Sequence, residues 1–140
     1  MKHLFLASSL LLSGLLTNCH DKGPGPMPPQ LYGSTWDLSS STVVLTNPTG
    51  TTTTTTSTVP SGTYSITYPG DGTYRLTTGG ATATGGCVYD GSTITLSTTV
   101  GASQNRVMTV SALTTTQLVT VEKTQTAGSS YTTTSTYTRL

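Results

Sequence analysis

The sequence predicts an all-β protein, an antiparallel up-and-down meander barrel of about eight strands. Threonine makes up 35 of the 140 residues, and its β-branched side chain suits a pleated strand better than a helix interior. Short segments in which apolar and polar residues alternate recur between turn signals. Apolar side chains are sparse. The core must therefore be thin and supplied by single faces of strands, which a closed barrel achieves.

The length of the chain allows one folded domain. Threonine and glycine at this abundance are also typical of disorder, but the alternation of apolar residues argues against disorder for most of the chain. Beyond Asn18 the charged side chains balance, with Lys22, Arg75, Arg106, Lys123 and Arg139 against Asp21, Asp37, Asp71, Asp90 and Glu122. A basic footprint is missing, so we expect no nucleic-acid partner, and we expect a monomer.

Residues 1–18 have the layout of a secretory signal, in which Lys2 and His3 precede an apolar run that is too short for a stable membrane span. The run ends at Leu16-Thr17-Asn18-Cys19, which resembles a bacterial lipobox, although Asn18 stands where a smaller residue is usual. The resemblance implies lipid attachment at Cys19 and a location in the bacterial cell envelope. We expect an anchor in a membrane, with the outer membrane favoured, and a domain in the periplasm or at the cell surface.

Residues 19–30 are rich in proline and glycine and are predicted to form a disordered, extended tether that lifts the domain at residues 31–140 off the membrane. An ordinary cleaved leader beside an incidental cysteine is the alternative. If Cys19 carries lipid, Cys87 has no disulfide partner within the chain and is predicted to be buried. A bridge between Cys19 and Cys87 would require the lipobox interpretation to be wrong.

The segment from Leu31 to Leu38 marks the start of the domain and holds Trp36, the single tryptophan. Trp36 and Leu38 share one face of a first strand, which Val43-Val44-Leu45 continues or resumes. The run Thr51 to Thr58 has strand propensity but no apolar face, so we interpret it as a solvated edge strand or a mobile hairpin. We expect the Trp36 segment to close one end of the barrel.

A hairpin is predicted where Tyr64, Ile66 and Tyr68 lead through Pro69-Gly70-Asp71-Gly72 to Tyr74 and Leu76. Gly79 to Gly86 is predicted to be a loop. A second hairpin turns at Asp90-Gly91, a dipeptide that tolerates positive φ. Further strands are predicted at 106–110 and 117–121, and a last one at 131–139.

These features resemble the lipocalin-like domains of bacterial lipoproteins, a calycin-type β-barrel. The resemblance rests on short motifs spread over the domain: Leu31, Gly33 and Trp36, the turn 68–74, the segment 90–96, the strand ends from Leu113 to Val121 and the closing Tyr137-Thr138-Arg139. Lipocalins usually carry Gly-x-Trp, whereas two residues separate Gly33 from Trp36 here. The family implies a cup for a small apolar ligand and an arginine packed across the tryptophan at the barrel base, which would be Arg139.

Catalytic chemistry has few candidates in this sequence. His20 is the single histidine beyond the leader and lies in the tether. Nucleophilic triads and histidine metal sites are therefore excluded from the barrel, and we expect no metal, cofactor or enzymatic activity. Asp37 and Glu122 could form a general acid and base pair, but solvated strand positions are the favoured interpretation.

Tyr64, Tyr68 and Tyr74 could line a ligand cup, although a role in the core and rim is the commoner outcome for such residues. The predicted function is a lipid-anchored barrel that binds a small hydrophobic ligand. The alternative is a non-catalytic structural or adhesive module with a filled barrel.

Overall fold

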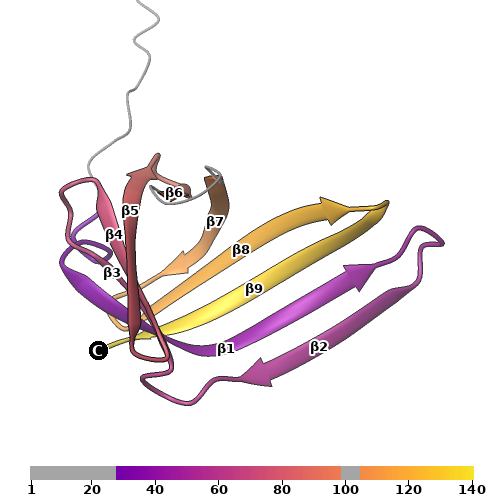
Figure 1. Ribbon diagram of the computed structural model, residues 1–140, viewed down its shortest axis with the longest axis horizontal. Coiled ribbons are helices and arrows are strands. Elements are labelled where there is room, and N and C mark those ends of the chain that lie inside the picture. Colours follow the sequence, from indigo (N-terminus) through magenta and orange to yellow (C-terminus); the bar gives the residue numbers. More distant parts are fainter. Residues whose placement is uncertain (1–27, 99–104) are drawn as a thin grey trace, which may run out of the picture.

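The computed structural model describes residues 28–98 and 105–140 as strands and turns without a helix (Figure 1). The predicted signal peptide, the proposed lipid site Cys19 and most of the tether lie outside the described residues. No helix among the described residues is long and apolar enough to cross a membrane. The strands are β1 (Ser34–Thr46), β2 (Thr52–Thr58), β3 (Tyr64–Tyr68), β4 (Thr73–Thr78), β5 (Ala81–Tyr89), β6 (Thr93–Thr98), β7 (Asn105–Leu113), β8 (Gln117–Thr126) and β9 (Ser129–Arg139).

Eight of these strands close into an antiparallel barrel. From β3 to β9 each strand pairs with the next in sequence, and β1 closes the ring by pairing with β3 on one side and β9 on the other. The predicted all-β meander barrel of about eight strands is therefore confirmed. The ninth strand, β2, is an addition that pairs only with β1 among the described strands.

A four-stranded arm projects beyond the barrel (Figure 1). It consists of β2 with residues 40–46 of β1, 129–136 of β9 and 123–126 of β8. The register between β1 and β9 shifts between Leu38 and Ser40, and such a bulge bends a strand and increases its twist. Despite this bulge, the first strand is continuous from Ser34 to Thr46. The threonine run is an edge strand, as one of its two interpretations predicted, because β2 is at the end of the sheet order and all of its residues are exposed.

The buried core includes the end of the barrel at which β1 begins, which we call the closed end. Leu31 and Trp36 are fully buried, and the segment before β1 is fixed by hydrogen bonds from Leu31 N to Pro28 O at 2.9 Å and from Gly33 N to Tyr68 O at 2.8 Å. The strands supply the remaining buried apolar side chains, which are Ile66, Tyr68, Tyr74, Cys87, Ile94, Leu96, Met108, Leu118 and Tyr137. Trp36 is the third residue of β1 and is therefore buried near this end of the barrel.

The prediction of a loop over Gly79 to Gly86 is wrong. Only Gly79 and Gly80 form the turn, and β5 begins at Ala81. A Cβ atom on Gly85 would lie 2.2 Å from the Ser97 carbonyl oxygen and 2.6 Å from the Tyr74 ring. Glycine is needed at this strand position because the wall of the barrel and the Tyr74 ring approach it closely, which is a recognised use of glycine within a strand.

Both predicted hairpins are confirmed. Ser65 pairs with Thr77 across β3 and β4, and Val88 pairs with Thr95 across β5 and β6. The Asp90 carboxylate accepts hydrogen bonds from the backbone N–H groups of Ser92 at 2.9 Å and Thr93 at 2.7 Å. These bonds lower the pKa of Asp90.

Candidate ligand-binding cup

A cavity of about 430 Å³ lies at the end of the barrel opposite Trp36. We call it the cup. Strands β4, β6, β7 and β8 line it with aromatic, aliphatic and polar side chains: Tyr74, Leu76, Leu96, Thr98, Asn105, Arg106, Glu122 and Thr124. Its size is within the range of small-molecule pockets, which typically measure about 300 to 1,000 Å³.

Alternation along the strands explains why Arg106 points into the barrel. Arg106 stands two residues before the buried Met108, whereas the intervening Val107 is 52% exposed. Arg106 also pairs with the buried Leu96 across β6 and β7. Because side chains alternate between the two faces of a strand, Arg106 shares the inward face with Met108.

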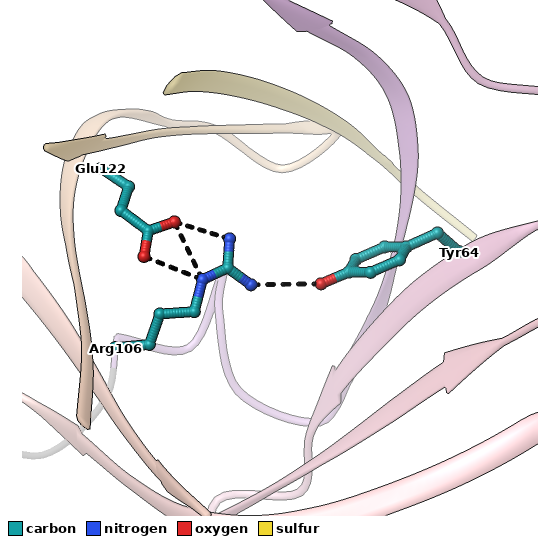
Figure 2. A network of polar contacts seen from close by, with 3 residues as sticks. All are labelled: Tyr64, Arg106 and Glu122. Carbon is teal, nitrogen blue, oxygen red and sulfur yellow. Dashed lines mark hydrogen bonds and ion pairs between the residues drawn. The ribbon is translucent and has the colours of Figure 1, made fainter. Parts of the chain in front are cut away.

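Arg106 and Glu122 form a bidentate ion pair within the cup (Figure 2). Arg106 Nη2 donates to Glu122 Oε2 at 2.7 Å, and Arg106 Nε donates to Oε2 and Oε1 at 2.9 and 3.0 Å. The remaining nitrogen, Nη1, donates to the Tyr64 hydroxyl at 3.4 Å. This planar pairing is the geometry in which guanidinium and carboxylate groups bind most strongly.

The ion pair leaves the cup electrostatically balanced. The hydrogen bonds from Arg106 to Glu122 raise the pKa of the guanidinium, while partial burial opposes this shift. The arginine side chain is 39% exposed and the glutamate side chain 17%. Each charge is neutralised by the other at the wall, so the cup offers no uncompensated charge from this pair.

The three tyrosines expected to line a cup occupy different environments. Tyr74 lines the cavity. The Tyr64 hydroxyl accepts a hydrogen bond from Arg106, which lines the cavity. The centroid of the Tyr64 ring lies 6.5 Å from that of the Tyr137 ring, and the two rings are tilted by 43°. Tyr68 is buried at the closed end, opposite Ser34 of β1, and burial raises its pKa well above its usual value.

The residues predicted at the barrel base meet as neighbours in the sheet. Trp36 of β1 and Arg139 of β9 are directly opposite each other in the register. Arg139 is exposed, and its guanidinium donates to the Thr115 carbonyl at 3.4 Å. Among the described buried side chains, the indole Nε1 of Trp36 is left without a hydrogen-bond partner.

The two strand-borne carboxylates are not at solvated positions, so that interpretation is wrong. Asp37 is 5% exposed. Its carboxylate accepts from Ser61 Oγ at 2.6 Å and from the Gly62 N–H at 3.0 and 3.1 Å. Asp37 follows the inward-facing Trp36 in β1, so its side chain is on the other face of the strand. Glu122, in contrast, bonds to Arg106 within the cup. The structure therefore does not bring the two carboxylates together as an acid and base pair.

Arg106 is the functional candidate that the sequence did not single out. The available signal was its spacing of two residues from Met108, which places both side chains on one face. Cys87 is buried as predicted, and burial raises the pKa of its thiol to about 11. The described residues contain no group of three or more histidine, cysteine, aspartate or glutamate side chains that could hold a metal ion.

Searches of protein-family models, curated proteins and solved structures found no match to this chain. The class of protein is therefore defined by its own geometry. It is a closed antiparallel β-barrel with a cavity at one end and a projecting arm, an architecture that is compatible with a calycin-like fold.

Proposed function

We propose that this protein is a lipid-anchored barrel of the bacterial envelope that binds a small, mainly apolar molecule in its cup. The cavity at the open end of the barrel is the observation that carries the proposal. An eight-stranded barrel has an interior that side chains can fill or one small ligand can occupy. Here the closed end is filled by side chains, and the open end retains space for a ligand.

The lining of the cup indicates the chemistry of the ligand. Tyr74, Leu76 and Leu96 provide apolar and aromatic wall for a hydrophobic body. Arg106 and Glu122 compensate each other, so a ligand with a strong net charge of either sign would meet one opposing and one like charge. A neutral molecule with one hydrogen-bonding group fits this environment, and the proposal includes no catalytic step.

The proposed anchor limits how far the closed end can lie from the membrane. Pro28 lies at the closed end, where its carbonyl accepts from Leu31. Cys19 precedes it by nine residues in sequence, which an extended chain can span over at most about 30 Å. An acylated Cys19 would therefore keep the closed end within about 30 Å of the membrane surface.

The ligand proposal is tested by native mass spectrometry of the protein purified from its own host. We expect a recurrent bound species in the wild type and its loss in Thr98→Trp, which places an indole in the cup. Val107→Trp adds the same group on the outer face of the barrel and should retain the ligand. Repeated spectra of a folded but empty wild type would refute ligand binding and favour a filled structural module.

The anchor is tested separately by membrane fractionation of Cys19→Ala. Loss of the acyl chains should move the protein from the membrane fraction to the soluble fraction, because several acyl chains are needed for stable anchoring. If Cys19→Ala stays with the membrane, the anchor proposal fails. The cup proposal is independent of this result.

A further inference from the structure

We propose that the free edge of β2 pairs with β2 of a second copy of this chain, so that two arms join into one continuous sheet. The first observation is an unprotected edge. Within the described sheet β2 pairs with β1 on one side, and its other side faces no strand. All seven residues from Thr52 to Thr58 are exposed. Every second N–H and C=O group along that edge is therefore available to another strand.

The β2 edge lacks the features with which proteins normally block strand pairing. It contains no charged residue and no proline, and its register with β1 runs without a bulge. Charged side chains, prolines and bulges are the usual protection of an exposed edge. The opposite margin of the arm differs, because the pairing of β8 with β7 ends at Glu122 and the next residue is Lys123. One edge of the arm thus carries a charge and the other is open.

The side chains of β2 are complementary to a copy of themselves. In an antiparallel pair centred on Thr55, Thr54 of one copy would lie opposite Thr56 of the other. The sheet already uses such pairs between β1 and β2, where the hydroxyl oxygens of Thr42 and Thr56 lie 3.0 Å apart and those of Thr46 and Thr52 lie 3.3 Å apart. Cross-strand threonine pairs of this kind stabilise a sheet. A second copy supplies the same residues without like-charge repulsion.

The position of β2 leaves room for this partner. The arm projects away from the barrel and β2 forms its outer margin (Figure 1). Two arms can therefore meet edge to edge with the barrels at opposite ends of the joined sheet. The dimer replaces the monomer expected from the sequence, in which a threonine run without an apolar face gave no reason to expect a partner.

The experiment is sedimentation analysis of the purified full chain over a range of concentrations, with all variants in the same detergent. We expect a concentration-dependent dimer for the wild type. Thr54→Lys combined with Thr56→Lys places like charges opposite each other and should raise the dissociation constant on the order of tenfold or more. The corresponding pair of Thr→Glu substitutions should do the same. An equimolar mixture of the two variants should restore the dimer, because lysine then faces glutamate.

Gln125→Lys is the matched control, since it adds a charge to the same face of the arm at the β8 margin. It should leave the dimer unchanged. A wild type that stays monomeric at every concentration would overturn the proposal. So would a dimer that ignores the β2 charges or that the mixture fails to restore. Recovery of the dimer in the mixture also shows that both variants are folded.

Discussion

The ion pair between Arg106 and Glu122 should contribute measurably to stability as well as shape the cup. Its side chains are 39% and 17% exposed, which places the pair between two known regimes. Fully exposed pairs contribute about 0.2 to 1 kcal/mol, whereas breaking a buried pair costs about 3 to 5 kcal/mol. For this partly buried, bidentate pair we expect a coupling free energy of about 1 to 2 kcal/mol.

A double-mutant cycle measures this coupling. Glu122→Gln keeps the shape of the side chain but leaves the guanidinium without its counter-charge. Arg106→Gln shortens the side chain and leaves the Glu122 carboxylate without its counter-charge. The double variant should be destabilised by less than the sum of the two single effects. With a urea dependence of about 2 kcal/mol per M, each single variant should lower the unfolding midpoint by roughly 0.5 to 1 M.

The control for the cycle is Lys123→Gln, which removes a neighbouring exposed charge. It should change the free energy of unfolding by less than about 0.5 kcal/mol. A coupling free energy below about 0.5 kcal/mol between Arg106 and Glu122 would refute the reasoning, because the contact would then behave as a surface pair. A change in the urea dependence itself would instead indicate an altered native or denatured state.

Three further predictions concern the core and the wall. Trp36→Ala should lower the free energy of unfolding by about 3 to 5 kcal/mol. Trp36→Phe should lower it by much less, because phenylalanine keeps an aromatic ring in the core and removes the unpartnered indole N–H; equal losses in urea unfolding would contradict this. Burial raises the pKa of Tyr137 from 10.0 to about 12 because the phenolate is disfavoured inside the barrel, so stability is unaffected by this group below pH 10 and falls as the pH rises toward 12. Tyr137→Phe should flatten that alkaline loss, and an unchanged profile would show that Tyr137 is not its source. Gly85→Ala should destabilise the barrel because the new Cβ would lie 2.2 Å from the Ser97 carbonyl oxygen. The control is Ala83→Ser at an exposed position of the same strand, which should be nearly neutral in the same unfolding assay.

Local sequence determined the two hairpins and their turns. Alternation around Ile66 and Leu76, together with Asp90-Gly91, predicted both hairpins, because side-chain period and turn chemistry are properties of a few adjacent residues. The burial of Trp36 and Cys87 followed from their apolar character in a chain with few apolar residues. These predictions needed no knowledge of which strands lie side by side.

Only the tertiary structure decided which residues meet. Gly85 looked like part of a loop because its reason for being glycine, the Tyr74 ring and the Ser97 carbonyl, comes from two other strands. The pairing of Arg106 with Glu122 depends on the register of β7 against β8, which pairs Met108 directly with Glu122. Long-range register follows from closure of the whole barrel, so neither contact can be found from neighbours in sequence.

The threonine run shows the same division. Its composition predicted a solvated segment over Thr51 to Thr58, either an edge strand or a mobile hairpin, since threonine favours the extended backbone and no apolar face was present to bury. The structure shows that it is an exposed strand from Thr52 to Thr58. The tertiary structure decided that this strand would stand outside the barrel. The β9 strand already occupies one edge of β1 and β3 takes the start of the other, which leaves only residues 40–46 of β1 for β2.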